Sequence, residues 1–260
     1  MTINTAGYTV GTNEPLNYAR ILWNPLTGTV TGGGTNPAYA ANDYTSQRWL
    51  LSPGSQNWTL QTAADATVDS VFIAAHNLTG KTVTISTAAT AGGAHTTRTS
   101  FLVDDASTIA AFFNNAGTAY TIREVRVNVN DGADVAIGII RAGVSLQMPI
   151  PIYGGHRPLN LNRVTEAQQQ FSETGQWLGR IIKRRAVTSA YDWEYLKASW
   201  YDANFEPFAK TLPLRPFCIA GNPSKIATDV GFVWTDRDPE PVNMGIKAYR
   251  SVSLNVTGYY

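Results

Sequence analysis

The sequence has little of what most catalytic and metal sites are built from. Among its 260 residues there are one cysteine and three histidines, and charged residues make up only 15%. A single thiol excludes an internal disulfide, and it excludes zinc or iron–sulfur sites built from several thiolates. We expect Cys218 to be a small core residue, and we expect no metal site and no cofactor.

Long apolar runs are missing as well. No stretch of about 18 uncharged apolar residues occurs, and the N-terminal segment lacks the basic and apolar regions of an export signal. We therefore expect no membrane insertion and synthesis in a cytoplasm. Lysine and arginine number seven against nine acids in 1–150 and thirteen against ten in 151–260, which gives −2 and +3. Neither value suits a phosphate-binding face, so we expect no nucleic acid binding.

What the sequence does contain is β-branched residues and turn formers. Apolar segments recur about every ten residues between Gly, Pro and Asn, which is typical of an antiparallel sandwich. The first part is predicted to form strands at 19–23, 46–51, 57–62, 70–78, 82–87, 99–104, 107–114 and 121–130. In the last of these, apolar residues alternate with Arg126 and Asn128, which predicts one solvated face, and Glu124 marks a bulge. The Ala/Gly/Thr-rich stretch 86–100 is either a long loop or a two-strand excursion.

Prolines and glycines in 149–158 predict a domain boundary. Residues 1–148 would form a jelly-roll type β-sandwich, and residues 149–260 a second β-rich domain with one main helix. The fold class is therefore mainly β. In the second domain we expect two strands within 159–187 joined by a turn at 172–176, a helix near 189–206, and strands at 216–221, 229–236 and 250–260. Ser189 would cap that helix, Trp193, Leu196 and Trp200 would share its apolar face, and Pro207 would end or kink it.

The histidines raise the question of catalysis. His76 ends the apolar strand 70–78, where it is either a catalytic group or ligand, or a residue whose ring satisfies free backbone groups as the ladder stops. We favour the structural role, with Asn77 taking the left-handed turn conformation. No GxSxG elbow accompanies any serine, which argues against a Ser/His/Asp hydrolase. His156 follows two glycines and is expected to pack across the domain boundary, and His95 lies in the Ala/Gly/Thr-rich stretch.

Acidic and basic groups give weak signals. Asp104 and Asp105 are neighbours whose side chains point to opposite faces of a strand, so they are not expected to converge. Among the acids in 236–240, Arg237 separates the two aspartates, and the prolines at 239 and 241 indicate a rigid exposed loop, with a calcium site as the alternative. Paired acids make a glycosidase the leading enzyme hypothesis, but we expect no enzyme and assign no catalytic residue. For the basic residues 183–185 we expect either exposure to solvent or a salt bridge between subunits.

Aromatic residues allow two interpretations. Trp23, Trp49 and Trp58 either fill the core of the sandwich or form an exposed surface on which sugars stack. In a sandwich of this size, the core is the favoured place.

Several motifs in order resemble the tail-tip proteins of tailed bacteriophages, of the distal tail or baseplate type, with a discoidin-like, galactose-binding-type β-sandwich in front. The resemblance depends on Ala41, Asn42, Arg48, Trp49, Asp69, Val71, Ile73, Ala74, His76, Asn77 and Leu78 in the first half. In the second half it depends on IGIIRAGVSLQMPIPIYGGHRPLNLNR, GQWLGRIIKRRA, WYDANFEPF, RPFCIAG, DVGFVWTD and SVSLNVTGYY. The weakest part is 81–120.

This resemblance implies a structural virion protein located in the phage tail. It implies that copies of the chain assemble into a ring, commonly hexameric, that connects the tail tube to the hub or baseplate. Ring subunits need large contact surfaces of modest charge, which agrees with the composition. Because sandwich domains of this type bind sugars in other settings, the alternative function is a carbohydrate-binding module that contacts host surface glycans.

Overall fold

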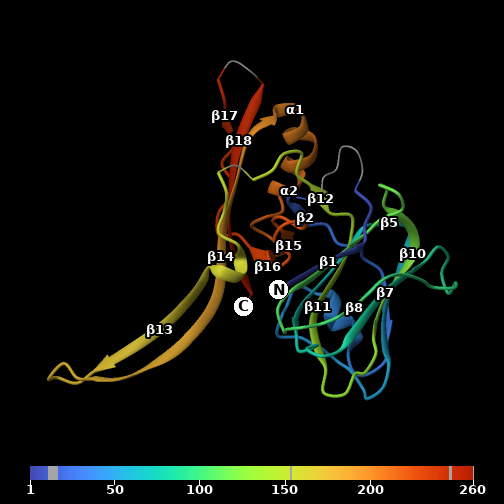
Figure 1. Ribbon diagram of the computed structural model, residues 1–260, viewed down its shortest axis with the longest axis horizontal. Helices are drawn as coiled ribbons and strands as arrows, with labels where there is room; N and C mark the ends of the chain where they lie inside the picture. The colour runs from blue at the N-terminus through green and yellow to red at the C-terminus, as the bar shows by residue number, and fades with distance from the viewer. Residues whose placement is uncertain (11–16, 153, 246–247, 260) are drawn as a thin grey trace.

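The computed structural model describes residues 1–10, 17–152, 154–245 and 248–259 and is mainly β (Figure 1). Three sheets account for the strands. The first contains, in spatial order, β1 (Thr2–Gly7), β9 (Ile109–Phe113), β6 (Ser70–His76), β11 (Ala136–Gly143) and β4 (Trp49–Leu50). The second contains β3 (Thr29–Gly32), β5 (Gln56–Val68), β10 (Tyr120–Val129), β7 (Thr82–Ala88) and β8 (Thr96–Leu102). Together these two sheets confirm the predicted β-sandwich.

The third sheet is formed largely by the second half of the chain. Its order is β12 (Leu146–Gln147), β2 (Arg20–Leu22), β15 (Phe217–Ala220), β16 (Val230–Trp234), β18 (Tyr249–Tyr259), β14 (Trp177–Lys197) and β13 (Arg163–Phe171), and β17 (Val242–Asn243) pairs with β18. The predicted C-terminal strand is confirmed up to residue 259, and its last residue, 260, lies outside the described residues. Single 3-10 turns occur at η1 (Pro37–Ala41) and η2 (Leu159–Leu161).

Two hydrophobic cores lie on the two faces of the first sheet. One fills the space between the first and second sheets, and it includes Val71 and Ile73 of β6 with Val125 of β10. The other contains Phe72 and Ala74 of β6 together with residues of the third sheet and of the helix. Since successive side chains of a strand point to opposite faces, β6 is buried on both sides, which explains its continuous apolar run.

The two segments of the chain share an interior. β2 and β12 come from the first 148 residues, yet they pair within the third sheet. The second core also takes residues from both segments. The division into domains at 148/149 stays a prediction, and any such domains are joined by strand pairing and by a common core.

Several local predictions are confirmed. The register between β10 and β5 shifts between Ile122 and Glu124, where the bulge was expected. For the stretch 86–100, the structure supports the prediction of two strands over that of one long loop, because β7 and β8 pair across a short loop at 89–95. Cys218 is buried in β15, and burial raises the pKa of its thiol to about 12.

The predicted helix near 189–206 is wrong in its first half. Strand β14 continues to Lys197, and the helical segment runs from 198 to 209 as α1 (Ala198–Trp200), a π-helical turn η3 (Tyr201–Phe205) and α2 (Glu206–Ala209). Tyr191 and Trp193 are fully buried and alternate with less buried neighbours, and the segment pairs with β18 on both sides of a bulge at 194–195. An available partner strand therefore outweighs the helix-like spacing. Pro207 follows the π-helical turn directly, and the helical segment continues past it to Ala209, so Pro207 does not end the helix at its own position.

No helix in the described parts of the chain is long and apolar enough to cross a membrane.

Candidate functional site

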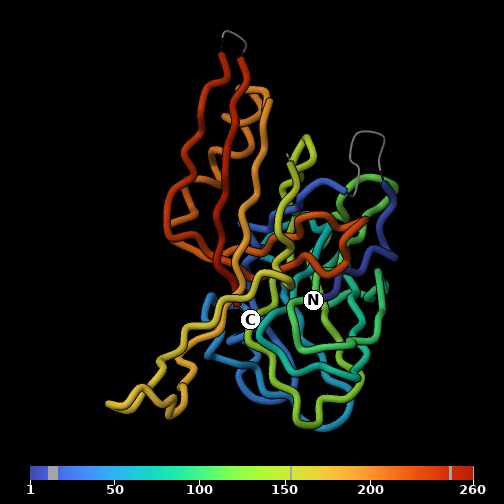
Figure 2. Tube along the Cα trace, turned by 60° about the vertical axis from the view of Figure 1, so that its left-hand side comes forward, coloured from blue at the N-terminus to red at the C-terminus, as the bar shows by residue number. Residues whose placement is uncertain are grey.

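A two-stranded ribbon, which we call the arm and define as residues 163–185, extends away from the body (Figures 1 and 2). It consists of β13 and the first part of β14, joined by the turn at 172–176, as the sequence predicts. β14 pairs with β18 only from Ala186 onward, which lies opposite Tyr259. Before Ala186, β13 is the only strand paired with β14 within the described residues.

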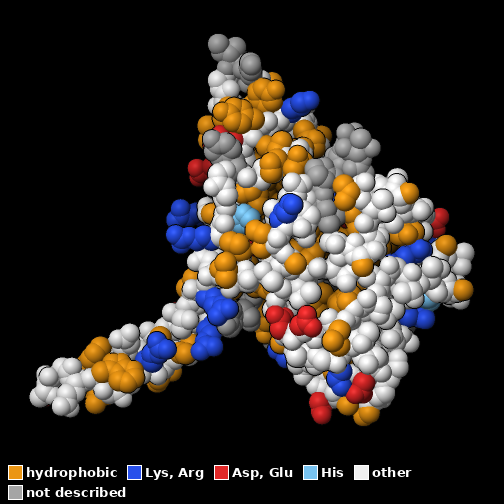
Figure 3. Space-filling model, in the orientation of Figure 1, with side chains coloured by type: hydrophobic (Ala, Val, Ile, Leu, Met, Phe, Trp, Pro, Cys, Tyr) orange, Lys and Arg blue, Asp and Glu red, His pale blue; other side chains and the backbone are white. Residues whose placement is uncertain are grey.

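The arm exposes an unusual amount of apolar surface. No residue of the arm is buried, and it carries six of the sixteen exposed large hydrophobic residues in the described part of the chain. These six are Val164, Phe171, Trp177, Leu178, Ile181 and Ile182. Figure 3 shows orange side chains near the tip of the arm and blue ones along its length. A two-stranded hairpin is marginally stable alone, and apolar residues gathered on a surface mark a site of protein interaction.

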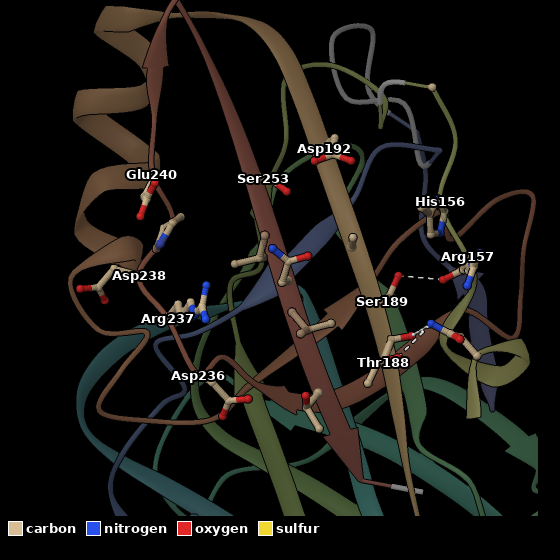
Figure 4. Close-up of a pocket in the computed structure, with 18 of the residues that line it drawn as sticks. His156, Arg157, Thr188, Ser189, Asp192, Asp236, Arg237, Asp238, Glu240 and Ser253 are labelled. Atoms are coloured by element: carbon tan, nitrogen blue, oxygen red, sulfur yellow. Dashed lines mark hydrogen bonds between the residues drawn. The ribbon is translucent and has the colours of Figure 1, made fainter. Parts of the chain in front are cut away.

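A wide trough of about 1170 Å³ lies beside the base of the arm (Figure 4). Strands β14 and β18 form its floor, and 154–157 and 236–240 lie at its two sides. Thr188, Ser253 and Asn255 are among the polar residues that line it. Four acids also line it: Asp192, Asp236, Asp238 and Glu240. The lining is therefore polar and acidic, which suits a cationic or hydrogen-bonding partner.

A buried hydrogen bond between His156 and Asp229 fixes one side of the trough. The Nε2 atom of His156 lies 2.5 Å from a carboxylate oxygen of Asp229, and the other oxygen accepts a hydrogen bond from the amide of Leu159 at 2.9 Å. The hydroxyl of Tyr191 donates to the same carboxylate at 3.4 Å, and its ring lies 5.1 Å from that of His156. Burial raises the pKa of Tyr191 well above its usual value. These contacts of His156 are all with the second segment, so the expected packing across the boundary is corrected.

Both ring nitrogens of His76 are engaged by backbone groups. Nδ1 accepts the amide of Leu78 at 3.2 Å, so Nε2 carries the proton and donates to the carbonyl of Ser107 at 2.8 Å. Burial lowers its pKa to about 4, which keeps the ring neutral. The expected pairing with backbone groups is confirmed. The expected left-handed conformation at Asn77 is wrong, since the positive φ lies at Ala75 (54°). The Asn77 side chain instead bonds two backbone groups across the end of the ladder.

The remaining acids and His95 also have local partners or are exposed. Asp104 and Asp105 are both exposed and lie in the loop beyond the end of β8, and Asp105 binds the N-terminal amine at 2.9 Å. The imidazole of His95 pairs with Glu124 at 2.9 Å and holds the 89–95 loop. The three acids of the 236–240 loop are exposed, as predicted. Within the described residues, no three or more His, Cys, Asp or Glu side chains are grouped to hold a metal ion.

Two of the three tryptophans for which a core position was expected are fully buried. Trp49 and Trp58 are buried, and their indole N–H groups donate to the carbonyls of Gly33 and Pro37. This confirms the favoured interpretation for both. Trp23 is half-buried and packs on Phe208 with ring centroids 6.1 Å apart.

A second hollow, of about 770 Å³, includes Trp23. Tyr8 and Trp200 also line it, together with Arg20 and Asn114. The Arg20 guanidinium lies 4.5 Å from the centre of the Tyr8 ring. Aromatic faces beside hydrogen-bonding groups are the composition of many small-molecule and sugar sites. We call this the aromatic hollow.

Sequence reasoning identified the two strands and the basic run of the arm but missed the arm as a surface. The available signal was that Ile181 and Ile182 adjoin the basic run 183–185 and that Trp177 and Leu178 follow the turn directly. The pairing of β18 with β14, which places Tyr259 opposite Ala186 at the base of the arm, is not visible in the sequence.

No protein-family model and no curated protein sequence matches the chain. Among solved structures, chitosan-binding module 1 of a chitosanase/glucanase from Paenibacillus sp. IK-5 matches with a TM-score of 0.40 and 19% identity, over 45% of this chain and 96% of the module. A pectin-binding module matches at 0.37 and 16%, over 45% and 91%. A Clostridium perfringens module solved with GalNAc-β-1,3-galactose matches at 0.38 and 11%, over 45% and 94%.

These structural neighbours are carbohydrate-binding modules, and none of them is a phage tail protein. At such identities and TM-scores, the similarity carries no argument about what this chain binds.

Proposed function

We propose that this protein is a structural assembly component that works by binding further copies of itself through the arm. The observation that carries the proposal is the arm's six exposed apolar side chains, on a ribbon that pairs with no further strand among the described residues. Fully burying side chains of this kind contributes roughly 1.5–3 kcal/mol each, so even partial burial of six supports a stable interface. The exposed edges of a β-ribbon carry unpaired backbone groups that promote aggregation, and a partner that covers the arm would shield them.

The narrower proposal is a phage tail-tip protein, located in the virion, whose ring connects the tail tube to the hub. It is supported by the ordered motifs of the sequence alone. A hexamer is the ring size that this resemblance favours.

The test is to remove the arm and measure the mass of the particles in solution. Thr165 and Arg185 lie opposite each other in the ribbon, so residues 166–184 can be replaced by an Asn-Gly turn without changing the register. We expect the full chain to be oligomeric at micromolar concentration and the shortened chain to be monomeric. Its thermal unfolding should hardly change, because no residue of the arm is buried. A monomeric full chain, or an unchanged oligomer after shortening, would overturn the proposal.

A smaller change provides a matched control. Serine in place of Trp177 and Ile181 should weaken the association, because both side chains are more than 60% exposed in the single chain. Serine in place of Gln168 and Gln170 on the opposing strand changes the same ribbon without removing apolar surface, so it should leave the association unchanged. Equal effects of the two pairs would argue against an apolar interface.

Glycan binding is a second candidate function, and the aromatic hollow is the observation that favours it. Trp23→Ala should abolish any glycan binding detected by calorimetry or on a glycan array. Tyr44→Ala is the control, since Tyr44 is 64% exposed and lies outside the hollow. If no glycan binds the unmodified chain, or if binding survives Trp23→Ala, this second function is rejected.

A further inference from the structure

The arm and the trough carry opposite charge. In the arm, five basic residues stand against two acids, Glu166 and Glu173, which gives a net charge of +3. The basic residues are Arg163, Arg180, Lys183, Arg184 and Arg185. In the trough, four acids stand against Arg157 and Arg237, which gives a formal charge of −2 when histidine is left out of the count. Surfaces of complementary charge attract each other and set the orientation in which they meet.

Several of these charges have no ion-pair partner among the described residues. Arg184 pairs with Glu166 at 3.5 Å on the surface of the arm. Lys183 and Arg185 have no ion-pair partner among the described residues, and the same holds for the four acids of the trough. Unpaired charges of both signs on one chain are therefore available to a contact between two chains.

An arm cannot fill the trough of its own chain. β14 is one continuous strand in which the arm ends at Arg185 and the floor of the trough begins at Thr188. Residues 186–193 are held in register with β18, so the arm leaves the body in a fixed direction (Figure 1). To lie in its own trough, the ribbon would have to reverse within about three residues and break this pairing. The occupant must come from another molecule.

We propose that the basic arm of one copy docks into the acidic trough of the next copy. This inference rests on the proposed function and adds to it the receiving surface and the polarity of the contact. The contact joins two different surfaces, so it is heterologous: each copy gives an arm and receives one. Contacts of this type generate closed rings when the rotation between copies closes, and filaments when it does not.

Charge reversal tests the inference in the full chain. The arm variant carries Lys183→Glu and Arg185→Glu, and the trough variant carries Asp236→Lys and Asp238→Lys. All four side chains are exposed, so folding should be retained, and circular dichroism checks it. We expect each variant to self-associate at least about ten-fold more weakly than the unmodified chain, because two attractions become repulsions. Analytical ultracentrifugation gives the association constants.

Restoration is the decisive result. A chain with all four substitutions should regain most of the lost affinity, because its acidic arm then meets a basic trough. An equimolar mixture of the arm variant and the trough variant should also associate. The control carries Lys210→Glu and Lys225→Glu, two exposed lysines outside the trough and the arm, and makes the same change in net charge as the arm variant. It should associate like the unmodified chain.

The outcomes separate this inference from the proposed function. If shortening the arm abolishes association but the trough variant associates normally, or if the four substitutions together fail to restore binding, the arm docks elsewhere and the inference is wrong. If shortening the arm does not change the association, the proposed function is wrong, and the inference that rests on it is wrong as well. Restoration together with an unaffected control supports both.

Discussion

Protonation of His76 should destabilise the fold in a defined range of pH. The ring is buried, its Nδ1 accepts the Leu78 amide and its pKa is lowered to about 4, against 6.5 for a free histidine. At pH 7 the ring is neutral in both the folded and the unfolded chain, so it adds no pH dependence. Between pH 6.5 and 4 the unfolded chain binds a proton that the folded chain does not, and the free energy of unfolding therefore falls as the pH falls.

The size of the effect follows from the shift of about 2.5 pH units. Each unit corresponds to about 1.4 kcal/mol, so His76 should cost about 2 kcal/mol of stability between pH 7 and pH 5, and about 3 kcal/mol by pH 4. His76→Gln removes the titration and can keep the hydrogen bond to the Ser107 carbonyl. It should be less stable at pH 7 by about 1–3 kcal/mol, because the Leu78 amide loses its acceptor.

Urea unfolding of both proteins at pH 7, 6 and 5 measures the difference. The stability of the unmodified chain should approach that of His76→Gln as the pH falls, since only the unmodified chain has this histidine to protonate. Other groups titrate equally in both proteins and cancel. A constant difference across the three pH values would refute the assignment of His76 as a buried neutral residue. Loss of an enzymatic activity in a folded His76→Gln protein would refute its structural role.

Other predictions concern the core and the arm. Asp229→Ala should lower the free energy of unfolding by about 3–5 kcal/mol, measured by urea denaturation, because it leaves His156 and the Leu159 amide buried without their acceptor. Cys218 should resist modification by a thiol reagent until the chain unfolds, since its thiol is buried with a pKa of about 12. Serine at Trp177 should change the stability of the monomer by less than about 0.5 kcal/mol in thermal melts, because that side chain is 62% exposed.

Strands could be predicted from the sequence where the pattern is local. The alternation in 121–130 gave a strand with one solvated face, and the acid at Glu124 marked the bulge that the register shift confirms. The turn at 172–176 was predictable because Gly175 allows the left-handed conformation, with φ of 81°. The apolar run 70–78 predicted a strand, but only the third sheet explains why both of its faces are buried.

Features that depend on distant partners could not be predicted. The segment 189–197 has the spacing of a helix and becomes a strand because β18, some sixty residues later, pairs with it. The pairing of His156 with Asp229 joins residues 73 positions apart. The trough collects acids from two separate segments, and only their separate occurrence was visible in the sequence.

The same strand that the helix prediction missed is what gives the arm a direction. Beyond Ala186, β14 is fixed by its register with β18 and by the buried side chains of Tyr191 and Trp193. A helix at this place would have separated the arm from the sheet by a flexible joint, and the ordering of that joint would weaken any docking. Because the strand is continuous, the conformational entropy of orienting the arm is lost when the monomer folds and not when two copies associate. In the proposed assembly, the angle between neighbouring copies is then determined by the core of each one, and this is the property that a closed ring requires.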